Sequence, residues 1–497
     1  MMSVVVGVPL MASRPKTETP KATMHVAIDQ HFKAKVYTSG STISGHVTVR
    51  AVQDLALDNF EILFTGIAAT RLEFLQQYPS FCFRPFMKLR MPIQTSDLPS
   101  DRIFRAGQDY RIPFHFVVPH QLTIGACNHC CTCHAVREQH LRLPPSMGAW
   151  DADDQAPDMT HIEYAIKARI IKNVPGGAGP VKLVEGHHTL KVLPALPEDA
   201  PLAVSSIDER YRLSRTRTIR KSLFSTKTGL VTATSSQPEA IMLSADGYKA
   251  STSSVNVHLE YVPSSMDTPP PKINSVTGKL ISTTFFSAVP ISHLPNLGSR
   301  TKHDSSPCLS YLTTSSIFSR SIDTAAWTQH DVPTLRRDSG YSSTMADEDL
   351  SETDASNGRS RRGSRAGNSK KSRWSPIKYT TDLEIPFTIP TLTKKFFIPS
   401  FHSCLISRTY TLQLSLSVGP TGTAVTLSIP FQVGVEMIHE PHGSELPSFE
   451  SLMAQADEEE TEAHLQPRFM HTPESNIRFN NLLPQYESSR QPILSIG

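Results

Sequence analysis

The sequence holds 497 residues, of which 38% are hydrophobic, with 38 Pro, 24 Gly and a formal net charge of +3. So small a charge over this length argues against nucleic-acid binding through bulk electrostatics. The proline content indicates folded domains separated by Pro- and Ser-rich segments that bury little surface. No apolar run approaches the roughly 18 residues of a membrane span, so no transmembrane segment is expected.

The N-terminal segment, residues 1–21, is expected to be a disordered start. Its apolar stretch lacks a preceding basic region and contains Pro9, which argues against a secretory signal peptide. Seven cysteines without such a signal predict reduced thiols in a cytoplasmic protein and no disulfide framework.

The first half of the chain alternates apolar and polar residues with a period of two. The pattern is clearest in "TISGHVTVRA" (42–51), "YRIPFHFV" (110–117) and "HIEYAIKARI" (161–170). Such alternation places one face of each strand on a core and the other in water, which is typical of antiparallel sheets. We therefore predict an all-β sandwich from residue 22 to residue 194.

The second half repeats this pattern after a connection. Residues 195–215 mix Pro, acidic residues and Arg, and are interpreted as a linker. Alternation then resumes in residues 255–261, 410–418 and 425–435, which predicts a second sandwich over residues 216–436. Pro430 lies on the outward face of its strand, which indicates an edge position or a bulge.

Two segments are expected to be disordered. Residues from about 298 to 376 are dominated by Ser, Thr, Asp, Arg and Gly, and interrupt the second sandwich as an insertion. Residues 437–497 form a tail that is acidic in "QADEEETEA" and polar beyond it.

Several of these segments resemble a known family. "YTSGSTISGHVTV" (37–49), "DNFEILFTGIAATR" (58–71) and "FRAGQDYRIPFHFVVPHQL" (104–122) resemble the arrestin N-terminal domain, and "IEYAIKARI" (162–170) is similar to its next strand. "PPPKINSVTGKLISTTFFS" (269–287) and "FIPSFHSCLISRTYTLQLSLSV" (397–418) resemble the C-terminal domain of fungal α-arrestin-like proteins. The resemblance implies two tandem immunoglobulin-like β-sandwiches of the arrestin type.

The same resemblance implies an adaptor without an active site or a cofactor. Such adaptors hold the cytoplasmic tails of membrane transporters or receptors. They recruit a WW-domain ubiquitin ligase of the HECT type through Pro-Tyr motifs, for ubiquitination, endocytosis and sorting. The protein is therefore expected in the cytoplasm, with peripheral recruitment to the plasma membrane or endosomes. A trafficking or signalling scaffold of the same fold that acts without a ligase is the alternative.

The tail contains a candidate ligand for WW domains. Leu483, Pro484 and Tyr486 form an L-P-x-Y variant of the P-P-x-Y motif. Pro484 favours an extended backbone at low entropic cost, and an aromatic groove accepts the Pro and Tyr rings. Leu483 departs from the stronger motif, and a disordered tail can contain such a tetrapeptide by chance.

The insertion contains candidate phosphorylation sites. Ser339 and Ser364 each follow an Arg pair with the spacing that basophilic kinases read, and "DSGYSS" (338–343) fits a phosphodegron. A phosphate adds about −1.5 to −2 charges and would recruit phospho-binding proteins. A solvated linker is the alternative interpretation.

A cysteine-rich loop raises a metal or redox alternative. In "ACNHCCTCHA" (126–135), the candidate metal ligands are Cys127, His129, Cys130, Cys133 and His134. A closed zinc site usually draws its ligands from two separated C-x-x-C pairs, whereas these thiols share one short segment. Cys127-x-His129 and "HLRLPPSMG" (140–148) are similar to fungal arrestin-like loops. An ordinary loop without metal is therefore expected, with metal binding or thiol oxidation at exposed cysteines as alternatives. No G-x-S-x-G, P-loop or H-E-x-x-H pattern is present, so no enzymatic activity is expected.

Overall fold

The computed structural model describes residues 22–74, 77–173, 180–206, 208–222, 225–297, 308–322, 325–331, 377–391 and 394–437. Within these residues the chain is mostly β, and none of its helices combines the length and apolar character needed to cross a membrane. The helical elements are α1 (His134–His140) and the 3-10 turns η1 (Thr95–Asp97) and η2 (Ile124–Ala126). The strands are β1 (Ala22–Ile28), β2 (Val36–Tyr37), β3 (Thr42–Ala51), β4 (Leu55–Ala56), β5 (Asn59–Phe74), β6 (Gln77–Arg90), β7 (Ile103–Phe104), β8 (Asp109–Val117), β9 (Thr160–Asn173), β10 (Pro180–Val192), β11 (Ser214–Arg220), β12 (Lys227–Ser235), β13 (Ile241–Leu243), β14 (Ser253–Pro263), β15 (Ile273–Phe286), β16 (Leu309–Ser321), β17 (Thr328–Asp331), β18 (Ile377–Phe387), β19 (Phe401–His402), β20 (Ile406–Val418), β21 (Thr423–Phe431) and β22 (Val433–Val435).

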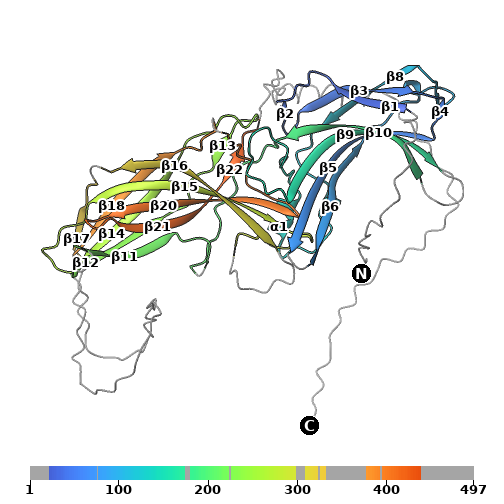
Figure 1. Cartoon of the computed structure of the whole chain (residues 1–497). Coiled ribbons are helices and arrows are strands. Elements are labelled where there is room, and N and C mark those ends of the chain that lie inside the picture. The colour runs from blue at the N-terminus through green and yellow to red at the C-terminus, as the bar shows by residue number, and fades with distance from the viewer. Residues whose placement is uncertain are drawn as a thin grey trace, which may run out of the picture. The chain divides into compact units, whose positions relative to one another are not determined.

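The N-terminal sandwich consists of two sheets whose apolar faces meet. One sheet has the order β1-β3-β8, and the other has the order β2-β10-β9-β5-β6. Strand β1 packs on β10 and β9 of the second sheet, and these strands lie together in Figure 1. Along β3, Ile43, Val47 and Val49 are fully buried, while Ser44, His46 and Thr48 are only partly buried. The predicted period of two is therefore confirmed in this strand, and burial of its apolar face stabilises the sandwich.

The C-terminal sandwich is built in the same way. One sheet has the order β11-β12-β14-β18-β17, and the facing sheet has the order β16-β15-β20-β19, with β21 paired to β20. The parallel pair β13 and β22 lies beside them (Figure 1). Leu412, Leu414 and Leu416 of β20 are fully buried, as their alternation predicts. The expected all-β class with tandem sandwiches is confirmed over the described residues.

Two strands lie inside the stretch that the sequence predicts to be disordered, residues 298–376. Strand β16 pairs antiparallel with β15, and β17 pairs antiparallel with β18. The prediction of disorder is therefore wrong for Leu309–Ser321 and Thr328–Asp331. Both strands lie at an edge of their sheet and keep most side chains partly or fully exposed, so their polar sequences need few apolar residues. Composition alone does not separate such an edge strand from a polar linker.

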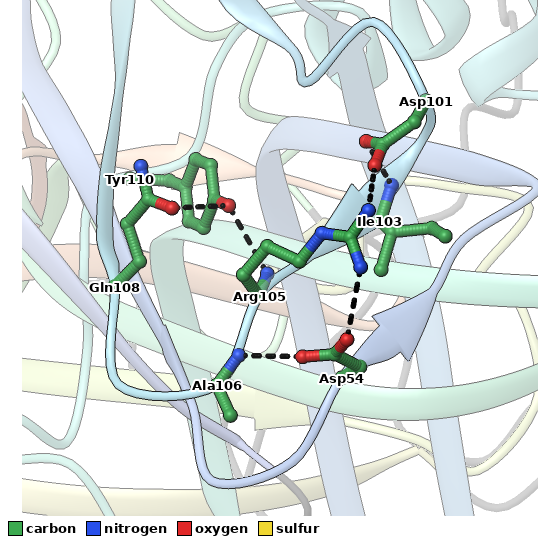
Figure 2. A network of polar contacts seen from close by, with 7 residues as sticks. All are labelled: Asp54, Asp101, Ile103, Arg105, Ala106, Gln108 and Tyr110. Atoms are coloured by element: carbon green, nitrogen blue, oxygen red, sulfur yellow. Dashed lines mark hydrogen bonds and ion pairs between the residues drawn. The ribbon is translucent and has the colours of Figure 1, made fainter.

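A polar network holds the turn between β7 and β8 in place (Figure 2). The guanidinium of Arg105 donates to a carboxylate oxygen of Asp54 at 3.1 Å and to one of Asp101 at 2.6 Å. Asp54 also accepts the backbone N–H of Ala106 at 2.8 Å, and Tyr110 Oη accepts the N–H of Arg105 at 3.0 Å. The Ala106 N–H and then Arg105 lower the pKa of Asp54. The network lies on the surface, since the Arg105 side chain is 53% exposed.

Candidate functional site

The cysteine-rich segment lies in the connection between β8 and β9 and folds back on itself. The turn η2 ends immediately before Cys127, and α1 begins immediately after Cys133. Helix α1 ends where the N–H of Leu141 bonds to the carbonyl of Arg137 at 3.1 Å. Its buried residues are Val136 and His140, which share one face because they are four positions apart. The helix thus directs the His140 ring back towards the cysteines.

Four side chains meet there, and we call Cys127, His129, Cys131 and His140 the Cys/His cluster. One ligand atom from each residue, a cysteine sulfur or one histidine ring nitrogen, lies within 4.8 Å of the other three. The Sγ atom of Cys127 is 3.7 Å from that of Cys131 and 3.7 Å from Nδ1 of His140. The His129 Nδ1 atom is also 3.7 Å from Cys127 Sγ. Cys127 is 1% exposed and His140 is 2% exposed, whereas His129 and Cys131 are half-buried, so the cluster is shielded from water on one side.

Burial favours the uncharged form of three side chains of the cluster, Cys131, His129 and His140. It raises the pKa of Cys131 to about 11, with the Cys127 sulfur as a further cause. It lowers the pKa of His140 to about 4, with the nearby His129 as a further cause, and it also lowers the pKa of His129. Without a cation, the Cys131 thiol keeps its proton and both imidazoles stay uncharged at pH 7. Two thiols and two neutral imidazoles form a donor set for a borderline-soft divalent metal such as zinc.

The structure separates the five candidate ligands that the sequence indicated. It brings Cys127 and His129 into the cluster and leaves Cys130, Cys133 and His134 outside. Cys130 and Cys133 are exposed, and His134 faces Glu138 across a surface contact of 3.3 Å. The expectation that the cysteines of this loop are exposed is wrong for Cys127, which the fold-back of α1 buries.

Sequence reasoning missed Cys131 and His140 as partners of Cys127. Spacing within the cysteine run favoured the C-x-x-C pairs, whereas in the fold Cys127 meets Cys131, four residues away, and His140, the last residue of α1. A usable signal was present in the helix, because Val136 and His140 share its inward face at i and i+4. A histidine on the apolar face of a short helix is a candidate for a packed, functional ring.

The cluster lies where the N-terminal sandwich contacts the C-terminal sandwich, a region we call the junction. The Nε2 atom of His129 is 3.0 Å from the carbonyl oxygen of Ile291. Ile291 follows strand β15 of the C-terminal sandwich. Beside this contact, the N–H of Thr132 donates to the carbonyl of Ser292 at 2.8 Å. The thiol of Cys404, next to β19, approaches the carbonyl of Ala126 at 4.0 Å. The cysteine-rich loop is therefore held by both sandwiches.

A buried arginine forms the second part of the junction. Arg408 of β20 is 0% exposed, and its Nη1 and Nη2 atoms each donate to the carbonyl oxygen of Asp154 at 3.1 Å. Its Nη2 atom also donates to the carbonyl of Gln155 at 3.0 Å, and its Nε atom to Thr284 Oγ1 at 2.9 Å. The positive φ of Gln155, 59°, turns the backbone so that consecutive carbonyls converge on the guanidinium. This loop of the N-terminal sandwich thus provides hydrogen-bond acceptors for the buried guanidinium of the C-terminal sandwich.

The segment expected to be a linker takes part in the same junction. Asp199 accepts two hydrogen bonds from Arg142, at 2.9 and 2.6 Å, while its N–H donates to Gln432 Oε1 at 2.9 Å. A cavity beside it is lined by residues of α1 and by His402 of β19. The Nδ1 atom of His402 is buried there without a hydrogen-bond partner. Burial lowers the pKa of His402 to about 4.

The other candidate site residues fall outside the described part of the chain. These are Leu483, Pro484 and Tyr486 of the tail motif, and Ser339 and Ser364 of the insertion. Their roles stay predictions.

Comparison with known proteins adds one match. Residues 309–435 match the family described as the Bul1 C terminus, the C-terminal part of an arrestin-related trafficking adaptor. The match begins with the first residue of β16 and ends with the last residue of β22. No curated protein matches the chain. The match thus covers the edge strand β16 and strand β20, which carries the junction residue Arg408.

Proposed function

We propose, from the arrestin-like family that the match over residues 309–435 supports, that this chain links membrane-protein cargo to a WW-domain ubiquitin ligase of the HECT type. The observation that carries the proposal is this match, in a chain whose described residues form tandem β-sandwiches. An adaptor of this kind acts by holding two proteins together. The proposal therefore assigns no catalytic residue and no cofactor.

The cargo side of the proposal is a surface of the sandwiches. Strand β6 ends the sheet order of the N-terminal sandwich in the described residues, so one side of its backbone can pair with an extended peptide. Phe81 and Phe83 of this strand are 55% and 71% exposed. An edge strand with exposed aromatic side chains suits the cytoplasmic tail of a transporter or receptor.

The ligase side of the proposal is the tail motif of Leu483, Pro484 and Tyr486. A WW domain binds such a segment by packing aromatic side chains against the Pro and Tyr rings. We expect Tyr486→Ala in the full chain to abolish capture by isolated WW domains. The matched control is Gln485→Ala, which changes the variable position of the motif and should leave capture intact.

Two results would contradict this assignment. Equal capture of wild type and Tyr486→Ala by WW domains would remove the motif as the ligase contact. Normal sorting of cargo in cells that express only Tyr486→Ala would favour a scaffold that acts without a ligase. Proximity labelling in the same cells identifies cargo and ligase together and separates these outcomes.

Phosphorylation of the insertion is proposed to regulate the binding of cargo and ligase. Ser339 follows Arg336 and Arg337, and Ser364 follows Arg361 and Arg362. A phosphate adds about −1.5 to −2 charges beside each Arg pair and creates a surface for phospho-binding proteins. Ser339→Ala and Ser364→Ala are expected to remove the corresponding phosphopeptides from mass spectra of the chain isolated from cells. Phosphorylation found only at other serines would assign the regulatory role to those serines instead.

The proposed place of action is the cytoplasmic face of the plasma membrane or of endosomes. Recruitment is peripheral in this proposal, through the cargo tail and not through a lipid-embedded segment. Removal of the cargo should therefore return the protein to the soluble fraction of a cell lysate.

A further inference from the structure

The distances inside the Cys/His cluster fit a tetrahedral metal centre. With Zn–S bonds of about 2.3 Å and Zn–N bonds of about 2.0 to 2.1 Å, ideal tetrahedral ligands lie about 3.8 Å apart for two sulfurs and about 3.6 Å apart for sulfur and nitrogen. The two sulfurs of the cluster are 3.7 Å apart. The His140 Nδ1 atom is 3.7 Å from Cys127 Sγ and 3.8 Å from Cys131 Sγ. One ion at the centre can therefore reach all three residues without a backbone shift.

The orientation of His129 supplies the fourth ligand. Its Nε2 atom lies 3.0 Å from the carbonyl oxygen of Ile291, which fixes that nitrogen as the N–H donor. The Nδ1 atom then carries the lone pair, and it lies 3.7 Å from Cys127 Sγ, whereas the ring atom 3.7 Å from Cys131 Sγ is Nε2, so the ring must turn to bring Nδ1 to both sulfurs. Histidines that bind metals usually donate their second ring nitrogen to a carbonyl or carboxylate in this way. The carbonyl of the C-terminal sandwich thus orients a ligand of the N-terminal sandwich.

The chemistry of the cluster favours zinc over other ions. Thiolate and imidazole donors select borderline-soft metals, and a tetrahedral set of two sulfurs and two nitrogens is typical of zinc. Hydrogen bonding alone explains the arrangement less well, because thiols are weak donors and weak acceptors. Calcium and magnesium prefer oxygen ligands, which these four side chains lack.

We propose that Cys127, His129, Cys131 and His140 bind one Zn²⁺ ion in a closed structural site. On binding, the thiols of Cys127 and Cys131 lose their protons to solvent, and the two thiolates balance the charge of the ion. Both histidines bind as neutral rings, so the site is uncharged overall. Four protein ligands leave no open position, which assigns the ion a structural role and no catalytic one. The ion fixes the cysteine-rich loop against Ile291 and so strengthens the junction.

The experiment uses the full chain without a polyhistidine tag. After incubation with zinc and removal of the excess by gel filtration, elemental analysis should find about one zinc per chain. X-ray absorption of this wild-type protein should show two sulfur and two nitrogen ligands, a result that requires no variant to fold. Cobalt substitution should give the visible absorption of a tetrahedral thiolate complex.

Paired variants locate the site. Cys127→Ser with Cys131→Ser should lose the zinc, whereas Cys130→Ser with Cys133→Ser, the matched exposed pair on the same loop, should retain it. Circular dichroism checks that each variant keeps its sheet content. The proposal is overturned by wild type without zinc, by a different ligand count, or by zinc lost only from the Cys130 and Cys133 variant. A Cys127–Cys131 disulfide in the freshly purified chain, found by mass spectrometry without reductant, overturns it as well.

Discussion

Arg408 and Arg105 show how differently one side chain can act in two regions of the molecule. Arg408 is 0% exposed and donates to two backbone carbonyls and a hydroxyl that belong to both sandwiches. Arg105 is 53% exposed and donates to two carboxylates of neighbouring turns (Figure 2). Opposite charges make the second set stronger in vacuum, but water and salt screen it. Burial, and not the charge of the partners, therefore decides which arginine stabilises the fold.

The strongest test of this comparison removes the buried guanidinium. Arg408→Met should lower the free energy of unfolding by about 3 to 5 kcal/mol, because the carbonyls of Asp154 and Gln155 lose their donors in a buried place. Urea unfolding followed by circular dichroism measures the loss. Arg217→Met, at an exposed position of β11 in the same sandwich, is the matched control and should change little. Equal effects of both substitutions would refute the role of burial.

The next test asks whether the junction responds to pH through His402. Burial lowers its pKa to about 4, whereas an unfolded histidine titrates near 6.5. Between these values the unfolded chain binds more protons, so stability falls as pH decreases from about 6.5 to about 4, by on the order of 3 kcal/mol over the whole range. His402→Gln should make this part of the stability profile less steep, while buried His140, whose pKa is also lowered to about 4, keeps part of the slope. His258→Gln, at a half-exposed ring, should leave the profile steep.

Removing a neutral hydrogen bond across the junction should destabilise the fold less than the loss of Arg408 and more than the loss of Arg105. The Oγ1 atom of Thr70 donates to the carbonyl of Ser287 at 2.9 Å, and Thr70 is 3% exposed. Thr70→Val keeps the shape and leaves that carbonyl without its donor, at a cost of about 1 to 2 kcal/mol. Thr48→Val, on the outward side of β3, is the control. A thermal shift no larger than that of the control would show that the bond contributes nothing.

The smallest effect is expected at Arg105. Arg105→Met should change the unfolding midpoint only slightly, and the change should vanish in concentrated salt. Because the pKa values of Asp54 and Asp101 are lowered in the fold, their contribution is present above the ordinary carboxyl pKa and is lost as pH falls through the folded values. Acid unfolding of the variant should therefore begin at nearly the pH of wild type. A large loss of stability of Arg105→Met at neutral pH would contradict the expectation that Arg105 contributes less to stability than Arg408.

The alternating strands were predictable because a half-buried strand needs only local information. Ile43, Val47 and Val49 point to the core for reasons visible within ten residues of sequence. Even Arg408 shares the parity of the buried Tyr410 and Leu412, so its inward direction follows from the period of two. Its partners do not follow, because the carbonyl of Asp154 lies 254 residues away in the chain.

The edge strand β16 and the Cys/His cluster were not predictable from local pattern for two different reasons. Strand β16 is held mainly by backbone pairing to β15, which is insensitive to side-chain composition. The cluster depends on a short helix that places His140 beside Cys127, so sequence spacing misidentified its members. The local sequence pattern thus predicts well which residues are buried, but it predicts poorly which distant residues meet in the fold.

The pairing of β17 with β18 has a consequence for how this protein can be modified. Asp331 lies opposite Ile377, so the whole segment between them, residues 332–376, connects two adjacent strands at one sheet edge. Each doubling of the length of a loop costs only about 0.6 kcal/mol of closure entropy. This position is therefore a natural point of insertion, where a fluorescent reporter or an added regulatory sequence can be placed with little effect on either sandwich.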